Sequence, residues 1–87
     1  MLINFTDSEF AQLVSLITYF SSTPVYRIDA DWTTIAYKVK TFKNTFTTEE
    51  IKALNKASHI FSERFAVNDS DYIKLRKKIQ ECHTISH

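Results

Sequence analysis

The stretch FTDSEF (residues 5–10) and the stretch FTTEEI (residues 46–51) carry the same pattern, F-T-x-x-E-[F/I], 41 positions apart. In each stretch a threonine precedes a glutamate by three residues, which is the capping-box signature of a helix N-terminus. The apolar residues before and after stand where a hydrophobic staple would place them. A leucine three residues later, Leu13 or Leu54, continues each helical stripe. The two stretches therefore predict two helices that begin in the same way.

A second pair of matching stretches follows, DADW (residues 29–32) and DSDY (residues 69–72), 40 positions apart. Aspartate is a preferred N-cap residue, so each stretch predicts the start of another helix. Apolar and lysine positions match beyond it: Ile35 with Leu75, Lys38 with Lys78, and Val39 with Ile79. We predict one all-α domain spanning residues 1–87, a compact four-helix bundle built from two similar hairpins, 5–43 and 46–83. The helices are expected near residues 6–22, 30–43, 47–65 and 70–83.

One segment has an alternative interpretation. Thr33 and Thr34 are poor helix formers, so a β-hairpin through residues 25–42 competes with the predicted second helix. Pro24 ends the first helix because it cannot continue the helical hydrogen bonding. We interpret Val25–Ile28 as a connector that packs against the core.

Composition narrows the function. The 87 residues are 44% apolar and contain no glycine, which disfavours a phosphate-cradling loop. The net charge of +1 argues against an acidic DNA mimic and does not demand a nucleic-acid partner. The single cysteine cannot form an internal disulfide. The apolar run over residues 10–20 is too short to span a bilayer, and the start of the chain lacks signal-peptide features. We expect a cytoplasmic protein without membrane contact.

Two D-x-D pairs stand at the predicted starts of the second helix of each hairpin: Asp29 with Asp31, and Asp69 with Asp71. Carboxylates this close can bind a divalent cation. A calcium-binding EF-hand loop, however, needs about five ligand positions and a central glycine. We interpret both pairs as helix caps, because aspartate is favoured there by hydrogen bonding and by the helix dipole.

The remaining candidates for chemistry are incomplete. Cys82, His83 and His87 are metal-binding residue types near the end of the chain, but no fourth ligand is nearby and structural zinc sites use four. His59 precedes Glu63 by four residues, which resembles a general base with its orienting carboxylate but equally an ordinary surface pair. No matching nucleophile or glycine-rich loop is present. We predict no enzyme, no metal, no cofactor and no small-molecule substrate.

The predicted first helix is apolar nearly all round, whereas the third has Asn55 and Ala57 at the positions that match Val14 and Leu16. An extra apolar face on a small bundle indicates contact with another molecule. The alternative is that this face packs under the connector at residues 21–28. Aromatic residues dominate interface hot spots. The candidate contacts with a partner protein, or with a second copy of the chain, are Val14, Leu16, Tyr19, Tyr26 and Tyr37.

We therefore expect a small non-catalytic protein-interaction module that inhibits or regulates a partner protein; its size also suggests a virus-encoded effector. The alternative is a nucleic-acid-binding regulator, because lysines and arginine gather on the two even-numbered helices. Its contacts would be Lys38, Lys40, Lys74, Arg76, Lys77 and Lys78. A second alternative is a subunit whose task is self-assembly.

The two capping boxes generate the first prediction. Thr6→Ala and Thr47→Ala each remove one capping hydroxyl, and each should lower the free energy of unfolding by about 0.5–2 kcal/mol. Circular dichroism should show a mostly helical protein, and urea unfolding measures the loss. A spectrum dominated by β signal would contradict the four-helix prediction.

Overall fold

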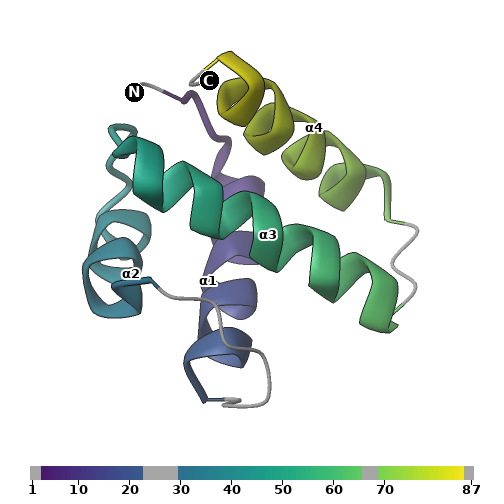
Figure 1. Cartoon of the computed structure of the whole chain (residues 1–87), viewed down its shortest axis with the longest axis horizontal. Helices are drawn as coiled ribbons and strands as arrows, with labels where there is room; N and C mark the ends of the chain where they lie inside the picture. The colour runs from purple at the N-terminus through teal and green to yellow at the C-terminus, as the bar shows by residue number, and fades with distance from the viewer. Residues whose placement is uncertain (1–2, 23–29, 66–68, 86–87) are drawn as a thin grey trace.

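The structure, a computed structural model, describes residues 3–22, 30–65 and 69–85. It contains four helices: α1 (Asp7–Ser22), α2 (Trp32–Lys40), α3 (Thr48–Phe65) and α4 (Ser70–Ile85). The predicted all-α four-helix bundle is confirmed. In Figure 1, α3 crosses in front of α1, while α2 and α4 lie at opposite sides of the molecule. Asp29 and the connector Val25–Ile28 fall outside the described residues.

Both capping boxes form as predicted. The Thr6 N–H donates to Glu9 Oε1 at 2.8 Å, and the Glu9 N–H donates to Thr6 Oγ1 at 3.2 Å. At the start of α3 the same two bonds join Thr47 and Glu50, at 2.8 and 3.1 Å. The staple at the first box is an edge-to-face pair between Phe5 and Phe10, whose ring centroids lie 5.5 Å apart. These local contacts fix where α1 and α3 begin.

Aspartates cap the other two helices. Asp31 is the N-cap of α2, and its carboxylate accepts from the Thr34 N–H at 3.1 Å and from the Thr34 hydroxyl at 2.6 Å. These hydrogen bonds lower the pKa of Asp31. At the start of α4, Asp69 Oδ1 accepts from the Asp71 N–H at 2.8 Å and from the Tyr72 N–H at 3.3 Å. The alternative β-hairpin through residues 25–42 is wrong where the structure describes that segment, because α2 occupies it as a capped helix.

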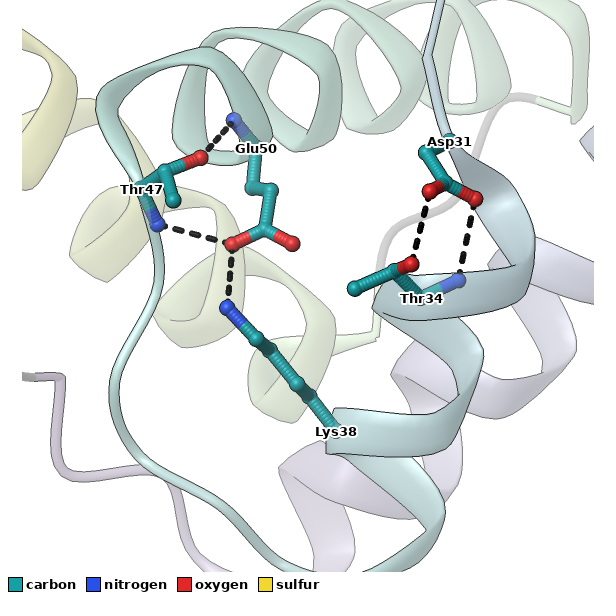
Figure 2. Close-up of polar contacts among 5 residues, drawn as sticks. All are labelled: Asp31, Thr34, Lys38, Thr47 and Glu50. Atoms are coloured by element: carbon teal, nitrogen blue, oxygen red, sulfur yellow. Dashed lines mark hydrogen bonds and ion pairs between the residues drawn. The ribbon is translucent and has the colours of Figure 1, made fainter.

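Each capping glutamate also binds a lysine from the opposite hairpin. Lys38 of α2 reaches Glu50 Oε1 at the start of α3, at 2.6 Å (Figure 2). Lys78 of α4 reaches Glu9 Oε1 at the start of α1, also at 2.6 Å. Burial by itself would raise the pKa of each glutamate, but the lysine and the threonine hydrogen bonds outweigh it and lower the pKa. The two ion pairs join the hairpins reciprocally.

The core lies around α1, which packs against all three other helices. Within the part of the chain that the structure describes, seventeen apolar side chains are buried in one cluster. Its fully enclosed members include Leu13, Leu16, Ile35, Phe46, Ile51, Leu54, Leu75 and Ile79. Because α1 has a neighbour on three sides, its nearly all-round apolarity is largely used inside the bundle.

Two helices differ from their predicted bounds by two residues or more. Helix α4 continues to Ile85, beyond the predicted residue 83, and α2 begins at Trp32 and ends at Lys40, inside the predicted range 30–43. At the end of α2 the Lys43 N–H donates to the Lys38 carbonyl, and the Phe42 N–H donates to the Val39 carbonyl. This is the hydrogen-bonding pattern of a Schellman motif. It places Phe42 outside the helix with φ at 56°, the left-handed value that this motif requires at its C′ position.

The cross-hairpin ion pairs predict a pH dependence. Because the folded-state pKa of Glu9 and Glu50 lies below the ordinary value of 4.5, their contribution to stability is full above about pH 4.5. It is lost as the pH falls through the folded-state values. Urea unfolding between pH 7 and pH 3 should therefore show falling stability in the native protein.

The double variant Glu9→Gln/Glu50→Gln should start less stable and show a flatter dependence over the same range. Glu49→Gln is the matched control, since Glu49 is an exposed neighbour in the first turn of α3. It should leave the slope unchanged. Equal slopes in the native protein and the double variant would show that the two pairs do not carry the acid sensitivity.

Candidate protein-interaction face

Two adjoining hollows lie between α1 and α2, and together we call them the α1–α2 groove. The larger has a volume of about 430 Å³ and is lined by Val14, Ile17, Thr18, Ser21, Trp32, Thr33, Ala36, Tyr37 and Lys40. The smaller, of about 330 Å³, is lined by Asp7, Phe10, Ala11, Val14, Val39, Lys40 and Phe42. Val14 and Lys40 line both hollows, so they form one continuous depression.

Aromatic side chains mark this groove. Tyr37 and Phe42 are among the most exposed large apolar residues of the described chain, with 61% and 60% of their surface open to solvent. Trp32, the single tryptophan, is half-buried at the first turn of α2 and stacks on Phe20, with ring centroids 6.3 Å apart. Large exposed aromatics beside an apolar depression are the usual composition of a protein-binding surface.

Phe42 occupies an unfavourable backbone conformation. A φ of 56° costs an L-residue with a side chain roughly 1–2 kcal/mol, and the C′ position of a Schellman motif is most often glycine. The Phe42 ring meets the Phe10 ring edge-to-face, with centroids 5.3 Å apart, yet remains mostly exposed. The chain thus holds a large apolar ring at the surface in a position where glycine would cost less.

The structure places only some of the predicted interface contacts in the groove. Val14 and Tyr37 line the groove. Leu16 is a correction: it is only 1% exposed and lies in the core, because α1 has neighbours on three sides. Tyr19 is half-buried on another face, where its ring packs edge-to-face against Phe61 and Phe65. Tyr26 lies outside the described residues.

Sequence reasoning did not single out the groove residues Trp32, Ala36 and Phe42. Trp32 and Ala36 lie on the apolar stripe of the predicted helix 30–43, and such a stripe does not by itself distinguish core from groove. Phe42 fell inside the predicted helix 30–43. Its exposure follows from the early end of α2, which no glycine in the sequence announces.

At the matching surface of the second hairpin, an arginine bridges the two helices. Arg76, which matches Ala36 in the 40-residue correspondence, extends from α4 to α3. There its guanidinium lies 3.1 Å from His59 Nδ1 and donates to Ser62 Oγ at 3.5 Å. With Nδ1 accepting from Arg76, His59 donates through Nε2 to Glu63 Oε1 at 3.1 Å. His59 and Glu63 are thus part of a polar surface network.

The six basic residues predicted for nucleic acid do not form one surface. Lys38 and Lys78 are neutralised by Glu50 and Glu9, and Arg76 is directed at α3. Lys40 lines the α1–α2 groove, while Lys74 and Lys77 lie on α4. Figure 1 shows α2 and α4 on opposite sides of the bundle. The depression beside Lys74 and Lys77 is also lined by carboxylates, those of Glu9, Asp71 and Glu81.

The side chains that could react or bind a metal are either engaged in other contacts or far from one another. Burial raises the pKa of Tyr72 to about 12, and its hydroxyl donates to the Ser58 carbonyl at 2.6 Å. Burial, with the nearby Glu81 carboxylate, raises the pKa of Cys82, which makes its thiol a weaker nucleophile. Among the described residues no three His, Cys, Asp or Glu side chains gather as metal ligands, and His87 lies outside them. No described helix is long and apolar enough to cross a membrane.

Comparison with known proteins adds no relative. No protein-family model matches the chain, and neither the curated proteins nor the solved structures searched contain a significant match. Function must therefore be argued from the groove itself.

The strained backbone at Phe42 predicts that a glycine variant is more stable than an alanine variant, the reverse of the usual order inside a helix. Phe42→Ala and Phe42→Gly both remove the ring and its contact with Phe10. Only glycine relieves the left-handed conformation, so Phe42→Gly should be more stable than Phe42→Ala by about 1 kcal/mol. Urea unfolding of the two variants measures this difference directly. An alanine variant as stable as the glycine variant would mean that residue 42 is not held at positive φ in solution.

Proposed function

We propose that this protein is a non-catalytic protein-interaction module that inhibits or regulates a partner protein through the α1–α2 groove. The observation that carries the proposal is the open apolar groove flanked by Tyr37 and Phe42. Such a surface on a small bundle is typical of a site covered by another protein.

The conformation of Phe42 supports the same proposal. Strained backbone positions in proteins concentrate at functional sites. Glycine would adopt the backbone conformation of residue 42 with less strain. Phenylalanine instead places an exposed ring beside the smaller hollow, where it contacts the Phe10 ring edge-to-face. Rigid, exposed aromatics bind a partner with little further loss of conformational entropy.

The nucleic-acid alternative has less support. Binding of phosphates requires several free cations on one surface. Here Lys38 and Lys78 each neutralise a capping glutamate, and the exposed Lys74 and Lys77 share their depression with three carboxylates. Self-assembly through the groove would use the same residues as binding of a foreign protein, and solution mass distinguishes the two.

The test is affinity capture from an extract of the source organism with tagged protein, with and without nuclease. Val14→Asn and Tyr37→Lys place in the groove the residues that stand at matching positions of the second hairpin, Asn55 and Lys77. Each should reduce retention of a specific partner at least tenfold while circular dichroism and melting stay native-like. Ser15→Asn is the control, since Ser15 is exposed on α1 and does not line the groove.

Size-exclusion chromatography with light scattering identifies a second copy as the partner. Retention that is equal in the native protein and both groove variants would overturn the proposal. Retention that disappears on nuclease treatment would favour the nucleic-acid alternative instead.

A further inference from the structure

The second hairpin shows how a groove of this geometry is filled. Arg76 lies between α3 and α4, with its guanidinium at His59 and Ser62. Its Nε is buried and has no hydrogen-bond partner among the described residues, while the residue as a whole is half-buried. One long side chain therefore bridges the two helices.

The positions that receive Arg76 have counterparts in the open groove. In the 41-residue correspondence, His59 matches Thr18 and Ser62 matches Ser21, and both Thr18 and Ser21 line the larger hollow. Ala36 stands where Arg76 would be. At the larger hollow a methyl group thus stands where the second hairpin has a long side chain, and a side chain supplied from outside has room to enter.

The lining of the larger hollow favours an apolar side chain and disfavours an arginine. The floor of the larger hollow is apolar, formed by Val14, Ile17, Trp32, Ala36 and Tyr37. Among the described residues that line it, Lys40 is the single charged one, and none carries a carboxylate. Beside these residues a cationic side chain would be repelled by Lys40 and would find no counter-charge. An aromatic or long aliphatic side chain fits the floor.

The charges around the groove indicate which groups the partner carries next to its apolar anchor. Lys40 lines both hollows, is exposed, and has no ion pair within the described ranges. Lys43 lies just beyond the end of α2 and is also exposed. Against them stands Asp7 of the smaller hollow, the one acidic side chain among the described residues that line the groove. A partner surface complementary to this groove therefore carries carboxylates beside its apolar anchor.

We propose that the α1–α2 groove takes an acidic amphipathic helix of a partner protein, whose aromatic or aliphatic anchor fills the place that Arg76 fills in the second hairpin and whose carboxylate pairs with Lys40. A helix supplies both groups, because residues three or four apart share one face. The inference rests on the proposed function and names the chemistry of the partner segment.

The probe is a pair of synthetic helical peptides of about 18 residues, or five turns. Both carry the same leucine and phenylalanine stripe; one is flanked by glutamates and the other by lysines. Binding is measured by fluorescence anisotropy of labelled peptide, and emission of Trp32 reports whether the groove is occupied, because it is the single tryptophan and lines the larger hollow. The acidic peptide should bind at least tenfold more tightly than the basic peptide and shift the Trp32 emission.

Two variants locate the contact. Ala36→Arg places the second hairpin's own residue in the groove and should reduce binding of the acidic peptide at least tenfold. Ser15→Arg adds the same charge on α1 outside the groove lining and should leave binding unchanged. Lys40→Glu changes only an exposed side chain and should reverse the preference between the two peptides. Melting temperatures confirm that each variant folds.

Equal affinity for the two peptides, tighter binding of the basic peptide, or binding insensitive to Ala36→Arg would overturn this inference. The proposed function is judged separately, by whether Val14→Asn and Tyr37→Lys reduce capture of the natural partner. Capture that depends on those residues, together with peptides that show no charge preference, would leave the interaction module standing and refute the acidic helix.

Discussion

The bundle depends on two glutamates that each serve two purposes. Glu9 and Glu50 close the capping boxes that start α1 and α3, and each accepts a lysine from the opposite hairpin. A carboxylate held by a backbone N–H and an ammonium group stays ionised although it is buried, since the hydrogen bonds and the opposite charge offset desolvation. The same atoms therefore fix where a helix begins and which hairpin lies beside it. Figure 2 shows this junction at Glu50.

This arrangement determines what the rest of the chain can present. With the hairpins joined at both capping boxes, α1 lies among the other three helices and uses most of its apolar surface inside. The side of α1 next to α2 retains the apolar groove, where α2 is short and Ala36 leaves room beside α1. The protein's candidate binding surface is thus a consequence of how the hairpins are joined and of one small side chain.

The two hairpins differ most where function is proposed. Both begin with the same capping box and carry the same cross-hairpin lysine, whereas the first has Ala36 beside an open groove and the second has Arg76 bridging its two helices. The exposed Phe42 ring follows the end of α2, where the backbone has a left-handed conformation that is unfavourable for phenylalanine. Stability alone would favour a filled groove and a glycine at residue 42. The first hairpin has neither a filled groove nor a glycine at residue 42, as expected of a surface adapted to bind another molecule.

The sequence by itself determined the helical class and the starts of α1 and α3, because a capping box is a contact between residues three apart and needs no tertiary partner. The aspartate cap of α2 was equally readable, through the bond from Thr34 to Asp31. The tertiary structure alone decided which lysines meet which glutamates, since those pairs join residues 12 and 69 positions apart. It also decided that Leu16 is core while Val14 lines a groove, and that α2 ends before Phe42. The periodicity of a helix shows which residues share a face, but the neighbours packed around that helix decide which faces remain open.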